Sequence, residues 1–225
     1  IIFTFCVLKT MEKKDKLYFW RIKIIMNRIL IILVVLFTMS CTQDKRPILG
    51  DTDYQKKQNA KFKDASTSPL TKKDRKEFEG LDFFKFDSTF VVTAELKLIP
   101  DTKWFNMKTT TKRLSKERIY GVLTLSIHNE AYSLNVYQGE ENMQTEGLED
   151  YLFLPFLDDT NGEESYGGGR YIDLRIPESD TIIIDFNRAY NPYCVYNEKF
   201  SCPIVPRDNY LPIEIKAGVK SYKKF

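Results

Sequence analysis

The stretch that decides the fold class is IYGVLTLSIHNEAYSLNV, residues 119–136. Apolar residues occupy every second position from Leu123 to Ile127 and again from Tyr132 to Val136, with polar residues between them. A period of two is typical of a strand that buries one face. The residues that separate the two runs, 128–131, therefore predict a hairpin of antiparallel strands.

Further strands follow outward from this hairpin in both directions. Strand patterns are found at residues 90–98, 171–176, 181–186 and 213–215. The second and third of these flank the turn sequence Pro-Glu-Ser-Asp, which predicts another hairpin. The fold class that we expect is therefore mainly β, an antiparallel β barrel or sandwich.

One or two short N-terminal helices are expected in front of these strands. Residues 51–64 predict a helix that is capped by one of its first two residues. Residues 72–79 predict a second helix, because Thr71 can cap it and Gly80 stands where a left-handed residue commonly ends a helix. We expect residues 51–225 to form a single β-rich domain.

The first 50 residues are interpreted as a targeting segment followed by a tether. Residues 1–25 show no consistent pattern and are interpreted as an upstream or mis-called segment. Residues 26–40 combine a short basic region, an apolar run and small residues, which is the pattern of an export signal. The run is shorter than the roughly 20 apolar residues that cross a bilayer. Cys41 follows directly, as in a bacterial lipoprotein signal peptide, and residues 41–50 form a polar tether.

This interpretation makes Cys41 the lipid attachment site and the membrane a partner through a lipid anchor. The expected location is the bacterial cell envelope, as a membrane-anchored lipoprotein facing away from the cytoplasm. A plain cleaved signal peptide and a signal anchor are the two alternatives. The formal net charge is +3, but residues 1–40 hold seven basic and two acidic residues, so the remainder carries −2. A slightly acidic domain is not expected to bind nucleic acid, because neutralising phosphates requires clustered basic residues.

Two long blocks, YGGGRY at 166–171 and DFNRAYNPYC at 185–194, stand out in the second half of the chain. With shorter matches such as residues 152–156 and 202–203, they make the chain resemble the domain of unknown function 1684 family. The resemblance covers nearly all of residues 55–220. The family has no assigned activity, so the resemblance implies neither a reaction nor a cofactor.

The glycine run and the arginine behind it are the first candidate for a binding site. Three successive glycines can take unusual backbone angles, and their N–H groups can form an anion-binding nest to which Arg170 adds a bidentate donor. The alternative is a tight turn that leads into the strand at Tyr171, with Arg170 paired to a carboxylate such as Asp185.

The acidic residues just before the glycines are a candidate for catalysis. Asp158 and Glu164 could do acid–base work or hold a hard cation, whereas turn chemistry within this loop is the structural alternative. An envelope hydrolase or lyase that uses these acids and Arg170 around an anionic substrate is therefore our second functional hypothesis.

The close cysteine pair and the single histidine complete the chemically notable residues. Cys194 and Cys202 predict a disulfide in an oxidising compartment, while two free structural thiols, or a catalytic or metal-binding role, remain the alternatives. His128 is far away in sequence and lies in the predicted hairpin turn. We therefore expect no metal site and no cofactor.

The polar and aromatic residues after residue 186 fit either the rim of a pocket or a buried hydrogen-bonded corner. The ligand-binding candidates are Glu164, Tyr166, Gly167, Gly168, Gly169, Arg170, Asn187, Tyr190 and Asn191. Our first functional hypothesis is a β-rich domain that binds a small anionic or polar ligand, or a partner. A purely structural envelope component is the third hypothesis.

Overall fold

The computed structural model describes residues 20–21, 24–28 and 50–222. The chain divides into two compact units, Ile1–Arg46 and Pro47–Phe225. In the first unit the described residues are helical. Most of the predicted signal peptide, together with Cys41, lies outside the described residues. Among the helices that the structure does describe, none has the length and apolar character needed to cross a membrane.

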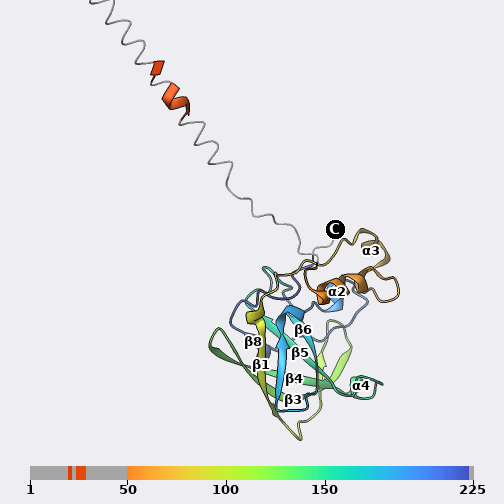
Figure 1. Ribbon diagram of the computed structural model, residues 1–225. Coiled ribbons are helices and arrows are strands. Elements are labelled where there is room, and N and C mark those ends of the chain that lie inside the picture. Colours follow the sequence, from red (N-terminus) through yellow and green to blue (C-terminus); the bar gives the residue numbers. More distant parts are fainter. Residues whose placement is uncertain (1–19, 22–23, 29–49, 223–225) are drawn as a thin grey trace, which may run out of the picture. The chain divides into compact units, whose positions relative to one another are not determined.

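The second unit is built on an eight-stranded, mainly antiparallel sheet that forms a half-barrel (Figure 1). The strands are β1 (Val91–Leu98), β2 (Phe105–Lys108), β3 (Leu114–Ile127), β4 (Glu130–Gly139), β5 (Tyr151–Asp158), β6 (Arg170–Arg175), β7 (Thr181–Asp185) and β8 (Tyr210–Leu211). Their order is β6-β5-β4-β3-β1-β7, while β2 pairs with β3 and β8 lies parallel to β5. The predicted fold class is therefore confirmed.

The hairpin predicted from residues 119–136 is formed by β3 and β4. His128 and Asn129 both have positive φ, at 52° and 67°, as a two-residue turn of the type I′ class requires. The turn brings Ile127 opposite Glu130 and fixes the register of the longest strand pair in the sheet. The alternation therefore points one row of apolar side chains toward the core.

Apolar side chains from seven strands fill the inside of the half-barrel. The buried cluster includes Ala94, Leu123, Leu134, Leu154, Phe156, Ile172 and Ile184. Removing such side chains from water contributes about 25 cal/mol per Å² of apolar surface, so this cluster is the main stabilising feature of the unit. A second cluster, which contains Phe62 and Tyr196, lies beneath the first helix of the unit.

The predicted pairing of the two late strands is wrong. β6 pairs with β5 and β7 pairs with β1, so the two strands stand at opposite ends of the sheet order. Residues 176–180 connect them and can span at most about 20 Å. A connection this short between the two end strands requires the sheet to curl, which explains the half-barrel shape.

Helices lie at one end of the half-barrel and beside its edge (Figure 1). They are α2 (Asp53–Lys63), α3 (Lys72–Glu77) and α4 (Glu140–Met143), with 3₁₀ turns η1 (Ser88–Phe90), η2 (Phe186–Arg188), η3 (Tyr193–Val195) and η4 (Arg207–Asn209). Thr52 caps α2 in a capping box with Gln55, and Thr71 caps α3, as predicted. Two details of the prediction are wrong: Gly80 is not left-handed, and residues 213–215 form no strand.

Candidate functional site

Arg170, the predicted anion ligand, lies inside the protein. It is the largest side chain that is completely buried, and its Nη2 donates to Asp158 Oδ2 at 2.8 Å and to the carbonyl oxygen of Ile215 at 2.8 Å. Its Nη1 donates to the carbonyl oxygen of Ala217. Burial lowers the pKa of Arg170, and the charge of Asp158 opposes that shift. Arg170 is therefore unavailable to an external anion, and its carboxylate partner is Asp158 rather than the expected Asp185.

The glycine run forms a tight turn into β6. Of the three glycines, Gly169 has a positive φ, at 88°, and a Cβ there would lie 2.6 Å from the carbonyl oxygen of Phe156. Its N–H donates to the carbonyl oxygen of Tyr166 at 3.1 Å. Gly167 and Gly168 are exposed. The glycine run is therefore a tight turn that leads into β6, and Arg170 does not contribute to an anion-binding nest there.

The acidic loop is likewise a turn held by hydrogen bonds, which was the alternative to a catalytic role. Asp158 Oδ1 accepts hydrogen bonds from the N–H and hydroxyl of Thr160 and from the N–H of Ile215. Glu164 is exposed and pairs with Lys216 at 3.2 Å. Neither acid lines either of the two pockets described below. The predicted catalytic pair is thus split between the interior and the surface.

Two of the three late candidates form a buried corner. Asn187 donates to the carbonyl oxygen of Asp87 at 2.8 Å and accepts from its N–H at 2.9 Å, which holds two distant segments together. Asn191 is completely buried and donates to the carbonyl oxygen of Lys220. Tyr190 is different, because its half-buried ring faces a pocket.

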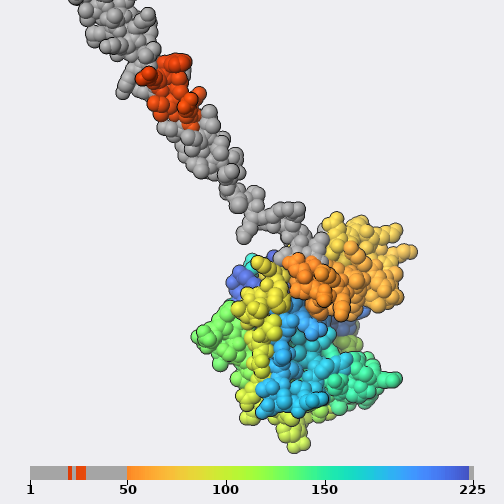
Figure 2. All heavy atoms as spheres, viewed as in Figure 1, coloured from red at the N-terminus to blue at the C-terminus, as the bar shows by residue number. Residues whose placement is uncertain are grey.

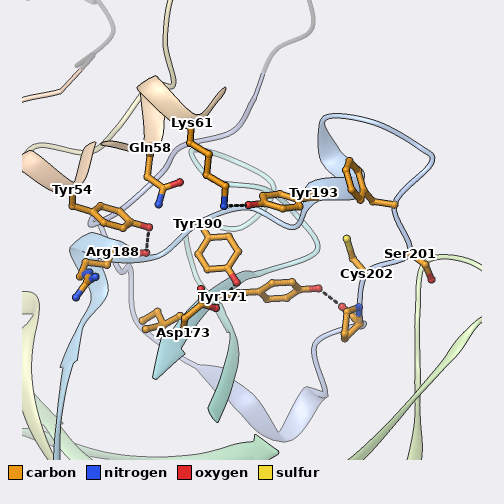
Figure 3. Close-up of a pocket in the computed structure, with 13 residues that line it drawn as sticks. Tyr54, Gln58, Lys61, Tyr171, Asp173, Arg188, Tyr190, Tyr193, Ser201 and Cys202 are labelled. Carbon is orange, nitrogen blue, oxygen red and sulfur yellow. Dashed lines mark hydrogen bonds between the residues drawn. The ribbon is translucent and has the colours of Figure 1, made fainter. Parts of the chain in front are cut away.

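This pocket, which we call the aromatic pocket, has a volume of about 370 Å³. It lies where α2 meets the segments that follow β7; Figure 2 shows the orange atoms of α2 directly against blue atoms of the C-terminal third. The side chains that give it its character are Tyr54, Lys61, Asp173, Arg188, Tyr190 and Tyr193 (Figure 3). Such a concave, largely aromatic hollow with a few convergent polar groups is typical of small-ligand sites.

Two cations border the aromatic pocket. Lys61 Nζ donates to the hydroxyl of Tyr193 at 2.5 Å, and the guanidinium of Arg188 lies 5.1 Å from the centre of the Tyr54 ring. Among the described residues, no carboxylate forms an ion pair with either cation. Both side chains are exposed and could therefore pair with an anionic ligand.

Asp173 lies in the aromatic pocket next to the hydroxyl of Tyr190 (Figure 3). Its Oδ1 accepts from the hydroxyl of Tyr151 at 2.8 Å and from the hydroxyl of Tyr190 at 2.5 Å. Burial, followed by the neighbouring Tyr151 and Asp173, raises the pKa of Tyr190 well above its ordinary value. The phenol of Tyr190 therefore stays protonated. The second carboxylate oxygen of Asp173 remains available to accept a hydrogen bond from a ligand.

Cys194 and Cys202 lie side by side near this pocket as free cysteines. The N–H of Cys194 donates to Cys202 Sγ at 3.2 Å. Burial raises the pKa of Cys202 to about 12, so its thiol is neutral and a poor nucleophile at physiological pH. The predicted disulfide stays a prediction for an oxidising compartment, and proximity supports it.

The pocket residues that sequence analysis missed carried one usable signal. Tyr54, Gln58 and Lys61 stand at positions i, i+4 and i+7 of α2, on a single face of the helix. That face, which adjoins the buried Phe62, is too polar for a core and carries a tyrosine that an ordinary solvated face would not need. Within the part of the chain that the structure describes, no group of His, Cys, Asp or Glu side chains could hold a metal ion.

Comparisons with known proteins agree with this fold but assign no activity. The family model described as "Protein of unknown function (DUF1684)" matches residues 76–220. The solution NMR structure of an uncharacterized protein of Haloarcula marismortui is similar, with 30% identity and a TM-score of 0.57. That similarity covers 73% of this chain and 89% of the archaeal chain. No curated protein matches the sequence.

Proposed function

Starting from the fact that the chain belongs to the DUF1684 family, whose function is unknown, we propose that it is a cell-envelope lipoprotein that binds a small anionic or polar ligand in the aromatic pocket. The location rests on the export pattern of residues 26–40 and on Cys41. The binding role rests on the pocket, which replaces the glycine run and Arg170 as the proposed site.

The observation that carries the proposal is the presence of two cations without carboxylate partners at one aromatic pocket. An exposed cation usually finds a carboxylate or faces open water, whereas Lys61 and Arg188 are both held against tyrosine rings. This arrangement holds the two positive charges at the pocket rim. An anionic group that enters there gains two charge-assisted interactions at once.

The other pocket residues narrow the chemistry of the ligand. The rings of Tyr171, Tyr190 and Tyr193 offer flat surfaces for a ring or an apolar body. The free oxygen of Asp173 accepts a hydrogen bond from a hydroxyl or amide group. We therefore propose a ligand with an anionic group at one end, a ring, and a donor group at the other end.

The binding proposal is tested with 4-hydroxybenzoate, which has these three features, and with its neutral analogue 4-hydroxybenzamide. Titration calorimetry should show that the carboxylate binds more tightly than the amide, and Arg188→Ala should weaken carboxylate binding by about tenfold, which corresponds to about 1.4 kcal/mol. Arg175→Ala is the matched control, because Arg175 is also exposed but lines neither pocket. Equal binding of acid and amide, or equal losses in the two variants, would contradict the proposal.

The location is tested separately by metabolic labelling with radioactive palmitate. Label should enter the chain expressed in bacteria, and Cys41→Ser should abolish it, because the lipid is attached to that sulfur. Cys194→Ser is the control and should leave labelling unchanged, since this cysteine lies in the folded domain. Unlabelled wild-type protein in the membrane fraction, or labelling that survives Cys41→Ser, would refute the lipid anchor.

A further inference from the structure

A second pocket adjoins the aromatic pocket and has a different chemistry. Its volume is about 490 Å³, and it lies between the ends of β3 and β4, the first residues of α4, and β5. It shares Tyr171, Tyr190 and Pro203 with the aromatic pocket, so these residues separate the two hollows. We call it the carboxylate pocket, because Glu117 lines it from β3.

Glu117 is a buried acid whose hydrogen bonding is incomplete. Its residue exposure is 5%, and its Oε1 accepts from the hydroxyl of Ser115 at 2.7 Å. Its Oε2 is buried and has no hydrogen-bond partner among the described residues. Leaving a buried acceptor unsatisfied is destabilising, and more so when the group is charged. This cost is removed when a donor enters the pocket.

The backbone opposite Glu117 leaves room for such a donor. Gly139 lies directly across from Glu117 in the β3–β4 register. A Cβ at this position would lie 3.1 Å from both carboxylate oxygens. Any residue other than glycine would therefore crowd the carboxylate, and the glycine keeps the approach to it open.

The other charged side chains of the carboxylate pocket are already engaged or do not neutralise Glu117. Lys116 pairs with Glu140 at 2.5 Å, and Arg113 Nη2 donates to the carbonyl oxygen of Ser201 at 2.9 Å. Burial raises the pKa of Glu117; the hydroxyl of Ser115 and the charge of Arg113 oppose that shift, and the charge of Glu141 adds to it. Arg113 therefore acts on Glu117 only from a distance, and within the described residues no cation forms an ion pair with this carboxylate.

Aromatic side chains form the other wall of this pocket. Tyr151 and Phe153 of β5 line it together with Tyr171 and Tyr190. The hydroxyls of these three tyrosines are hydrogen-bonded to Asp173 or to the carbonyl oxygen of Pro203, so their rings rather than their polar ends remain available. Aromatic rings around a carboxylate attract an organic cation through the negative faces of the rings.

From this arrangement we infer that the carboxylate pocket is a binding site for a small organic amine in its protonated form. The ammonium group donates a hydrogen bond to the unsatisfied oxygen of Glu117, while its carbon substituent lies against Tyr151 and Phe153. The site is distinct from the aromatic pocket, at whose rim Lys61 and Arg188 carry positive charges that form no ion pair within the described residues. It does not depend on the ligand proposed for that pocket.

The inference is tested with benzylamine as the probe and benzyl alcohol as its neutral analogue, at pH 7.5. Amide chemical shifts of the full chain should change on addition of benzylamine, with the largest changes at Glu117 and Gly139. Glu117→Gln, which keeps the shape but removes the charge, should weaken benzylamine binding at least tenfold. Benzyl alcohol should bind at least tenfold more weakly than benzylamine to the wild-type protein.

Two control variants separate this site from its surroundings. Glu140→Gln removes a charge from the same pocket, but from an acid that Lys116 already neutralises, and should change the affinity less than threefold. Arg188→Ala disables the aromatic pocket and should also leave benzylamine binding unchanged. Equal binding of benzylamine by the wild-type and Glu117→Gln proteins, no shift at Gly139, or equal binding of the alcohol would overturn the inference. Thermal unfolding of each variant shows whether it is folded.

Discussion

Breaking the ion pair between Arg170 and Asp158 should be among the most destabilising single changes in this domain. Both side chains are completely buried, and their closest atoms are 2.8 Å apart. Replacing Asp158 by asparagine keeps the shape and keeps an oxygen for Thr160 and Ile215. The other carboxylate oxygen is replaced by an amide nitrogen. This nitrogen is a hydrogen-bond donor, and it faces a guanidinium that also donates. The arginine is then a buried charge without a counter-charge.

The expected cost follows from this burial. Removing one partner of a buried pair costs about 3–5 kcal/mol, against a total free energy of unfolding of about 5–15 kcal/mol for a domain. Asp158→Asn should therefore remove about a fifth or more of the stability. Arg170→Met should also be destabilising, because Asp158 and the carbonyl oxygens of Ile215 and Ala217 lose a donor. The double variant should cost less than the sum of the two.

The chain offers a matched control for this experiment. Arg175 and Asp150 form an ion pair at 2.5 Å, but their side chains are 51% and 54% exposed. Such surface pairs contribute about 0–1 kcal/mol. Urea unfolding should therefore show a larger loss of stability for Asp158→Asn than for Asp150→Asn, although the exposed pair has the shorter distance. If the two asparagine variants lose the same stability, the reasoning from burial is wrong.

Two further changes test individual residues. Gly169→Ala should destabilise the domain by about 1–3 kcal/mol in urea unfolding, because its positive φ and its contact with the carbonyl oxygen of Phe156 both exclude a side chain, whereas Gly167→Ala should be nearly neutral. Glu117→Gln should stabilise the domain at neutral pH: burial raises the pKa of Glu117, so its stabilising contribution is complete below the unfolded value near 4.5 and is lost as the pH rises through the folded value. Unfolding curves at pH 3.5 and pH 7.5 check this, and an equal difference at both pH values would contradict it.

Sequence patterns predicted the longer strands β1, β3, β4, β6 and β7, but not the short strands β2 and β8. They missed β5, because burial there is nearly continuous and the alternation disappears. They also joined β6 to β7 through a turn sequence that is present but does not pair them. A turn signal is local, whereas strand pairing depends on which distant strands share a core. The sequence therefore predicted the fold class and most of the longer strands, but not the strand order.

The candidate site was harder to predict for a related reason. Charge and hydrogen-bonding capacity made Arg170 a reasonable anion ligand, but sequence alone does not tell which face of a strand such a residue occupies. The residues of the aromatic pocket, such as Lys61 and Asp173, are more than 100 positions apart and meet only because α2 packs near β6. Residues brought together by topology leave no short motif.

The two faces of β6 connect the buried motif with the proposed site. Side chains alternate along a strand, so Arg170 and Ile172 point into the core while Tyr171 and Asp173 point to the aromatic pocket. The bonds of Arg170 to Asp158 and to the segment 215–217 fix the register and rotation of the strand from inside. The same bonds therefore set the positions of Tyr171 and Asp173 on the other face. We therefore propose that the glycine and arginine motif supports the pocket from inside and does not form its wall.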